Sequence, residues 1–137
     1  MTSSPISAAK PQSEAALRIV GIGASAGGLQ AFEQFFARVP VHSGMAYIVV
    51  QHLDPTQKAM LAELLQRVTT LRVHEASEQM RVEPDHVYVI PPNTELSLAQ
   101  GVLHLTPPTE PRGSRLPINV LLSSLARDQG AMSIGVV

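Results

Sequence analysis

The spacing of apolar residues predicts alternating strands and helices in the first half of the chain. Two short apolar runs, Leu17–Gly23 and Ala46–Leu53, are bounded by glycine or polar residues and rich in β-branched side chains, which is typical of central strands in a parallel sheet. Residues 27–38 between them carry apolar side chains at spacings of three and four, and Pro40 follows, which predicts an amphipathic helix and its end. The apolar positions of this helix are Leu29, Phe32, Phe36 and Val39.

The second half of the chain continues the alternation and adds a hairpin. The same patterns predict a helix over 58–68, capped by Asp54 or Thr56, strands over Leu71–Ala76 and His86–Pro92, a β-hairpin turning at Gln100-Gly101, a proline-rich loop over 107–117, a helix over 118–130 ending at Gly130, and an apolar run over 133–137. We therefore expect an α/β fold, a doubly wound and mostly parallel sheet of Rossmann-like three-layer type, with the hairpin inserted and attached to the sheet.

The two ends of the chain differ in character. Residues 1–16 are rich in Ser, Ala, Pro and Gln and lack the apolar core of a secretory signal, so we expect a disordered leader before one domain over 17–137. Residues 133–137 form an apolar, β-branched run with no polar residue behind it. This predicts a domain that is truncated at its C-terminus.

Composition narrows the possible partners. Ten Lys and Arg balance eleven Asp and Glu, so no basic field indicates nucleic acid or an anionic membrane. The chain has no cysteine and no apolar run of the roughly 18 residues that a membrane-spanning helix requires. We expect a soluble, cytoplasmic protein without nucleic-acid or membrane partners and without a metal or cofactor.

The stretch VGIGASAGG, residues 20–28, has three interpretations. Read as G-x-G-x-x-A, it places Gly21, Gly23 and Ala26 as in a dinucleotide-binding fingerprint. Read as G-x-S-x-G, it places Ser25 as an esterase nucleophile at a strand-to-helix turn. In the simplest interpretation, the glycines only allow a sharp turn and close packing at a βα junction.

The end of the second strand favours the nucleophile. A dinucleotide site needs a carboxylate there to bind the ribose, but the sequence has Gln51 and His52, with Asp54 only just beyond. Because carboxyl ends of neighbouring parallel strands share one edge, His52 can act as the base for Ser25. The free N–H groups of the following helix, including that of Ala26, would bind an oxyanion, and the glycines would make room for an ester carbonyl.

The other histidines fit ordinary polar roles better than catalysis. They lie in predicted loops or exposed strand positions, whereas His52 ends an apolar central strand beside the Ser25 loop. They are His42, His74, His86 and His104.

With Ser25 and His52 identified, the sequence resembles the catalytic domain of CheB-type chemotaxis protein-glutamate methylesterases from about Leu17 to Val137. The resemblance rests on IVGIGASAGGLQAF, YIVVQHLDP, MRVEPDHVYVIPPNTELSL and LPINVLLSSLARDQGAMSIGVV in that order, and is closest to the branch fused to a CheR-type methyltransferase. It implies a Ser-His-Asp triad with Ser25 as nucleophile and His52 as base. The implied reaction hydrolyses glutamate methyl esters on the cytoplasmic domains of methyl-accepting chemoreceptors and releases methanol, with glutamine deamidation as a related activity.

The sequence departs from this family at two points. Ala26 stands where many relatives have threonine, so only its backbone N–H can contact an oxyanion. The family's aspartate lies in a glycine-rich loop beyond the strand that corresponds to 133–137, and we expect none of Asp54, Asp85 and Asp128 to orient His52 instead. Because the orienting acid contributes about 10⁴ in kcat in serine proteases, we expect residues 1–137 alone to have very weak or no esterase activity. A nucleotide-binding module and a degenerate, non-catalytic signalling domain remain the alternatives.

Overall fold

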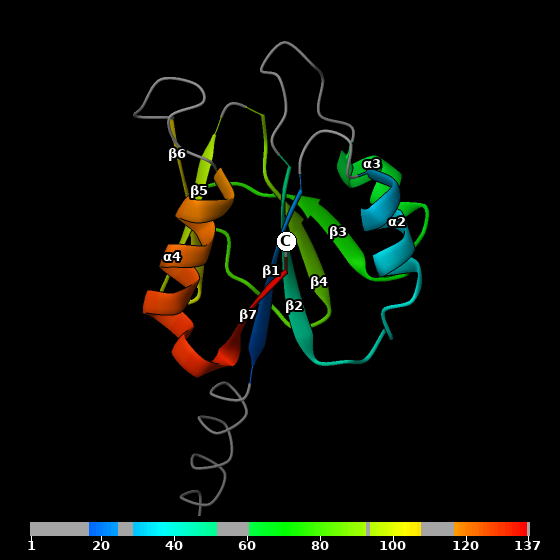
Figure 1. Ribbon diagram of the computed structural model, residues 1–137, viewed down its shortest axis with the longest axis horizontal. Coiled ribbons are helices and arrows are strands. Elements are labelled where there is room, and N and C mark those ends of the chain that lie inside the picture. The colour runs from blue at the N-terminus through cyan, green and yellow to red at the C-terminus, as the bar shows by residue number, and fades with distance from the viewer. Residues whose placement is uncertain (1–16, 25–28, 52–60, 93, 108–116, 137) are drawn as a thin grey trace, which may run out of the picture.

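The computed structural model describes residues 17–24, 29–51, 61–92, 94–107 and 117–136. Five strands form a parallel sheet in the order β3-β4-β2-β1-β7 (Figure 1). The strands are β1 (Arg18–Ala24), β2 (Met45–Gln51), β3 (Arg72–Glu75), β4 (His86–Val89) and β7 (Ser133–Val136). The leader predicted over 1–16 lies outside the described residues.

Helices cover both faces of this sheet, so the expected three-layer α/β architecture is confirmed (Figure 1). On one face, α2 (Leu29–Ala37) and α3 (Leu61–Gln66) bury Phe32, Phe36, Leu61 and Leu65 against Tyr47 and its neighbours. On the other face, α4 (Pro117–Gln129) and the hairpin bury a second cluster. Its most fully buried leucines and isoleucines are Ile19, Ile48, Leu96, Leu103, Leu121 and Leu125.

The predicted strand and helix positions are confirmed to within a few residues wherever the structure describes them. The helix expected over 27–38 spans Leu29–Ala37, and its apolar stripe packs on the sheet as the spacing predicts. The helix expected over 58–68 is described from Leu61, so its proposed caps, Asp54 and Thr56, lie outside the described residues. No helix in the described part of the chain is long and apolar enough to cross a membrane.

The hairpin differs from expectation in how it is attached. Strands β5 (Glu95–Ala99) and β6 (Val102–Thr106) pair antiparallel around Gln100 and Gly101, which confirms the predicted position of the turn. The φ angles of these two residues are 54° and 75°, so the turn is left-handed. The prediction that the hairpin joins the main sheet is wrong, because β5 and β6 form a separate two-stranded sheet. Leu96, Leu98 and Leu103 bury one side of the hairpin in the α4 cluster, so it packs by its face and not by a strand edge.

Candidate functional site

The candidate site lies at the edge where the parallel strands end. Ala24, the last residue of β1, is the register partner of Gln51, the last residue of β2. β7 lies on the other side of β1, with Ile22 beside Val136, and β4 lies on the other side of β2, with Val49 beside Val89. Four parallel strands therefore end along one edge, at the top of Figure 1.

The three predicted site residues, Ser25, His52 and Ala26, lie outside the described residues. What the structure describes is the backbone that leads to them. Ser25 follows Ala24 in the sequence and His52 follows Gln51, and these two preceding residues are paired across neighbouring strands. The expectation that both chain segments leave the sheet at one edge agrees with this register.

Gln51 is a buried polar residue at this edge, with 8% of its surface exposed. It alternates with Tyr47 and Val49, so its side chain lies on the face of the sheet that α2 and α3 cover. β2 contains no carboxylate, so a ribose-binding acid is absent from this strand. The sequence analysis noted only that Gln51 stands where a dinucleotide site would need a carboxylate. The structure shows that Gln51 is one of two buried polar side chains among the described residues.

Gly21 serves packing and not ligand approach, which corrects the expectation that it makes room for an ester carbonyl. It lies in the middle of β1, between Ile48 and Gly135 in the sheet, whereas a phosphate-binding glycine is expected in the turn after the strand. A Cβ atom added at Gly21 would lie 2.7 Å from Cδ1 of Leu125 and 3.2 Å from Cδ2 of Leu122. The glycine therefore allows α4 to approach the sheet closely, which weakens the dinucleotide interpretation.

The carboxylate of Asp128 contacts the backbone of the hairpin turn. From the last turn of α4, its carboxylate accepts hydrogen bonds from the backbone N–H groups of Gln100 at 2.5 Å and Gly101 at 3.0 Å. Partial burial opposes ionisation, but the hydrogen bonds from Gln129, Gln100 and Gly101 outweigh it and lower the pKa of Asp128. This carboxylate fastens the hairpin turn to α4.

Asp85 and Asp128 both lie near the edge where the strands begin, away from the candidate site. Asp85 directly precedes β4, and its carboxylate accepts a hydrogen bond from the N–H of Gly44 at 2.9 Å. Asp128 lies at the end of α4, shortly before β7 starts. Their places in the fold agree with the expectation that neither orients His52, and Asp54 lies outside the described residues.

Two histidines form a pair that the sequence did not reveal. Nε2 of His74 on β3 and Nδ1 of His86 on β4 are 2.8 Å apart, and their ring planes differ by 9°. Burial lowers the pKa of His74, and nearby His86 and Arg72 lower it further, while Glu83 opposes them. The pair depends on the register that sets Arg72 beside His86, and single-chain periodicity does not encode that register.

Two further polar groups have structural partners. Glu78 accepts a hydrogen bond from the N–H of Leu105 at 2.7 Å, and its carboxylate lies 3.3 Å from Nδ1 of His104. The hydrogen bond from Leu105 is the main cause that lowers the pKa of Glu78, and the contact with His104 is the second. The hydroxyl of Tyr88 accepts from the N–H of Glu83 at 2.9 Å, and burial raises the pKa of Tyr88. Neither group lies free for catalysis at the edge where β1 and β2 end.

Comparisons with known proteins agree with this architecture. The family described as CheB methylesterase matches residues 20–137. The crystal structure of the Thermotoga maritima CheB methylesterase catalytic domain matches with a TM-score of 0.74 and 25% identity, covering 86% of this chain and 65% of that one.

Relatives similar in sequence are named protein-glutamate methylesterase/protein-glutamine glutaminase. One from Methanosarcina acetivorans is 36% identical over 127 residues, and one from Pseudomonas aeruginosa is 33% identical over 130 residues. These matches cover 87% and 89% of this chain but only 36% and 37% of the relatives. The chain thus spans about a third of the length of the relatives that it matches.

Proposed function

Because this chain belongs to the CheB methylesterase family, we propose that it carries the nucleophile and base of a protein-glutamate methylesterase. The proposed substrate is a glutamate methyl ester on a methyl-accepting chemoreceptor, and the products are glutamate and methanol. Hydrolysis of a receptor glutamine side chain is the related activity, because it uses the same acyl intermediate. Relatives from three genera carry both activities in their names.

The register of Ala24 with Gln51 is the observation that carries this proposal. Ser25 and His52 are the next residues along the two strands, and a nucleophile needs a base within hydrogen-bond reach. Buried Gln51 at the end of β2, where a dinucleotide site would need a carboxylate, further favours the hydrolase over a dinucleotide-binding module.

In the proposed mechanism, Oγ of Ser25 attacks the ester carbonyl while His52 accepts the hydroxyl proton. The backbone N–H of Ala26 donates to the oxyanion of the tetrahedral intermediate. Collapse of this intermediate breaks the bond to the methoxy group, which takes the proton from His52 and leaves as methanol. Water then attacks the acyl-enzyme with His52 as base, which releases the glutamate side chain and restores Ser25.

The third member of the triad is proposed to follow β7. β7 is the parallel neighbour of β1 on the side away from β2, so a segment that leaves its carboxyl end emerges at the edge where β1 and β2 end. An aspartate from that segment would hold the imidazole of His52 in the tautomer that accepts the serine proton. Residues 1–137 alone are accordingly proposed to hydrolyse esters very weakly or not at all.

A serine-reactive fluorophosphonate tests the proposal on a chain extended through this aspartate. We expect covalent labelling at Ser25, with a loss of about 10³-fold or more in labelling rate for His52→Ala. The matched control is His104→Ala, since His104 lies on the hairpin beside Glu78. Labelling elsewhere than Ser25, or a rate that His52→Ala leaves unchanged, would sink the proposal.

The cellular setting is proposed on the same basis. The protein would act in the cytoplasm on the cytoplasmic domains of chemoreceptors. The sequence motifs that it shares with the family favour the branch that is fused to a CheR-type methyltransferase. The coding sequence that follows Val137 tests the fusion directly. A methylated receptor fragment tests the substrate, with methanol release as the measurement.

A further inference from the structure

Two polar side chains are buried among the described residues, and only one of them lies at the candidate site. Ser124 on α4 is 2% exposed, and its hydroxyl donates to the carbonyl of Leu121 at 2.8 Å and accepts from the N–H of Leu98 at 3.0 Å. These two bonds account for Ser124 as an attachment of the hairpin to α4. Gln51, which is 8% exposed, ends β2 at the edge where the catalytic residues are proposed to act.

The buried side chains on the same face of the sheet as Gln51 are almost entirely apolar. Tyr47, Val49 and Gln51 alternate along β2 and so lie on the face that α2 and α3 cover. Apart from Tyr47, the buried cluster on this face consists of aliphatic side chains and phenylalanines. The hydroxyl of Tyr47 lies 2.9 Å from Oγ of Ser43, near the opposite end of β2. Gln51 has a polar partner, as a buried amide requires, and the side chains of this cluster cannot supply it.

The chain segment that follows β1 can supply that partner. Ala24 and Gln51 are register partners at the ends of their strands, and neighbouring strands lie about 4.8 Å apart. Four residues, 25–28, connect Ala24 to α2, and α2 covers the face on which Gln51 lies (Figure 1). A connection this short has to leave the sheet beside Gln51 and lead onto the same face. Its backbone N–H and C=O groups are suitable partners for the amide of Gln51.

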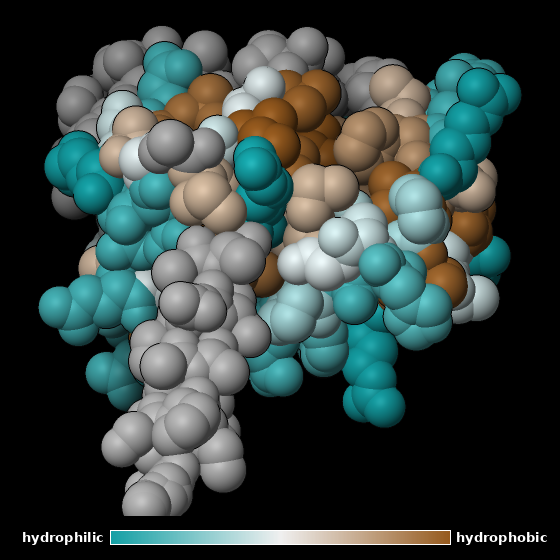
Figure 2. All heavy atoms as spheres, turned by 90° about the horizontal axis from the view of Figure 1, so that it is seen from below, coloured by the Kyte–Doolittle hydropathy of each residue, from teal (hydrophilic) through white to brown (hydrophobic). Residues whose placement is uncertain are grey.

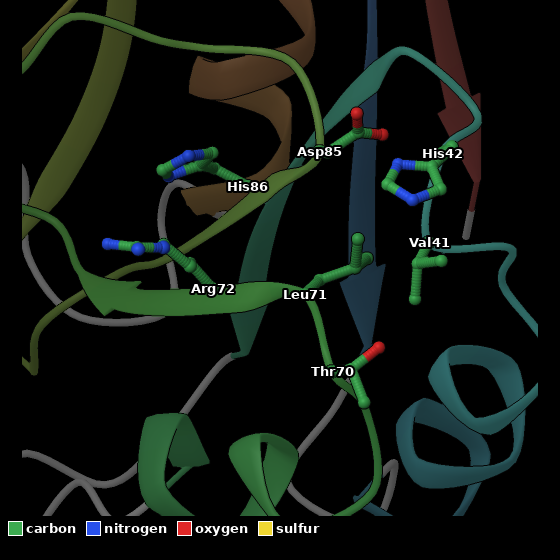
Figure 3. A pocket seen from close by; sticks show the side chains of 7 residues that line it. All are labelled: Val41, His42, Thr70, Leu71, Arg72, Asp85 and His86. Atoms are coloured by element: carbon green, nitrogen blue, oxygen red, sulfur yellow. The ribbon is translucent and has the colours of Figure 1, made fainter.

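Among the described residues, the edge where the strands begin offers no comparable buried amide. A hollow of about 410 Å³ opens there, and none of its described polar lining side chains is buried (Figure 3). Two of them, Arg72 and His86, point away from the apolar Val41 and Leu71. Figure 2, which views this edge of the molecule, shows hydrophilic side chains at the surface. Polar groups at this edge can be hydrated, whereas the burial of Gln51 has to be compensated by a hydrogen bond.

We propose that Gln51 is a positioning residue for the esterase reaction. Its side-chain amide hydrogen-bonds the backbone of residues 25–28 and thereby holds Oγ of Ser25 within hydrogen-bond reach of His52. This inference rests on the proposed function, and Gln51 neither touches the ester nor exchanges a proton with it. Because displacement of a reacting group by about 1 Å can cost about 10²-fold in rate, a hydrogen bond that holds this segment affects catalysis.

Fluorophosphonate labelling of the chain extended through the proposed aspartate tests this role. Gln51→Met keeps the length of the side chain and removes the amide. We expect it to slow the labelling of Ser25 in the folded protein about tenfold, because the segment loses the hydrogen bond that holds it. Labelling of folded Gln51→Met at the wild-type rate would overturn this inference alone. A wild-type chain that is not labelled at Ser25 would instead overturn the proposed function, and this inference with it.

Ser124→Ala is the matched control, because it removes the hydrogen bonds of the other buried polar side chain. We expect it to lower the midpoint of urea unfolding, as Gln51→Met does, but to leave the labelling rate unchanged. Should Gln51→Met fail to fold, Gln51→Asn gives the second measurement, since it keeps an amide and withdraws it by one methylene group, and it should also slow labelling. Equal slowing by Ser124→Ala and a Gln51 variant would attribute the effect to lost stability and contradict the role.

Steady-state kinetics distinguish positioning from substrate binding and from a purely structural role. The substrate is a methyl-esterified receptor fragment, and methanol release is the measurement. Gln51→Met should lower kcat about tenfold and change KM by less than about twofold, because Gln51 makes no contact with the substrate. A purely structural role would reduce the amount of folded protein but not kcat per folded molecule. A raised KM with an unchanged kcat would contradict the inference.

Discussion

The two outer strands of the described sheet, β3 and β7, differ in whether a neighbouring side chain covers their edge. At β3, the side chain of Gln66 from α3 acts as a neighbouring strand would: its Oε1 accepts from the N–H of Val73 at 3.0 Å, and its Nε2 donates to the carbonyl of Leu71 at 2.7 Å. At β7, Ile134 and Val136 are 39% and 36% exposed, and β7 pairs with β1 alone among the described strands. One edge is closed by an amide, and the other presents apolar side chains.

At β3, the protection of the edge comes from a side chain of the neighbouring helix and not from a further strand. Both strands are four residues long, and each pairs in parallel with a single strand of the sheet. β3 has a helix whose last residue reaches back to the strand, while α4 packs beside β7 through Leu122, which meets Gly135. Unpaired backbone groups on an edge strand invite pairing with another chain, so the β7 edge is the one expected to associate.

Gly21→Val should have the largest effect, because it separates α4 from the side of the sheet that holds β7. The added Cβ would lie 2.7 Å from Cδ1 of Leu125, which is 1% exposed and cannot move into solvent. We expect a loss of about 2 to 3 kcal/mol in the free energy of unfolding, measured by urea denaturation.

The matched control is Gly135→Val on β7 itself. There the nearest atom is Cδ2 of the partly buried Leu122, at 3.1 Å, and this side chain can shift. We expect less than about 1 kcal/mol, since valine also favours strand structure. Equal costs for the two variants would show that the contact of β1 with α4 is not the tighter one.

Gln66→Leu should open the β3 edge and make it resemble β7. The variant removes the donor to the carbonyl of Leu71 and the acceptor for the N–H of Val73. We expect a loss of about 1 kcal/mol in unfolding free energy, together with concentration-dependent association in sedimentation velocity. Gln34→Leu, the same change at an exposed position of α2, is the control and should produce neither effect. Association of the control variant to the same extent would attribute the effect to leucine and not to the edge.

Asp128→Asn should loosen the hairpin from α4, the helix that supports β7. The carboxylate accepts two backbone hydrogen bonds, and asparagine offers a single acceptor oxygen. Because the pKa of Asp128 is lowered in the folded state, its stabilisation is present above the unfolded pKa of about 3.9 and is lost as the pH falls through the folded pKa. We expect a difference of about 1 kcal/mol at neutral pH that vanishes in acid, measured by urea unfolding at both pH values. A difference that persists in acid would mean that the carboxylate charge is not responsible.

Much of the fold could be predicted because burial leaves a periodic signature in the sequence. Phe32 and Phe36 lie one turn apart and both pack on the sheet, and the apolar run of β2 is buried on both faces. The predicted apolar runs end at Gly23 and Leu53, within two residues of the observed strand ends at Ala24 and Gln51. This is why the edge on which Ser25 and His52 are proposed to act could be named in advance.

Side-chain bonds to distant backbone groups could not be predicted in this way. Gln66 and Asp128 look like ordinary polar helix residues, and their roles depend on which strand or turn the fold brings to them. The role of Gly21 was predicted wrongly for a related reason. A glycine that lets a helix pack closely on a strand and a glycine that makes room for a ligand look the same in the sequence. The hairpin was misplaced because strand patterns do not specify which edge or face a pair of strands uses.

Ile134→Lys should have the smallest effect on stability and should bring the β7 edge closer to the protected β3 edge. Ile134 is 39% exposed, so replacing it should change the unfolding free energy by no more than about 0.5 kcal/mol. A lysine on an edge strand opposes pairing with a second strand through charge and the loss of apolar surface, so association at high protein concentration should fall in sedimentation velocity. Val41→Lys makes a comparable change at a 41% exposed position between α2 and β2 and should leave association unchanged. If both variants reduced association equally, exposed apolar surface in general would drive it, and the contrast between the two edges would lose its physical basis.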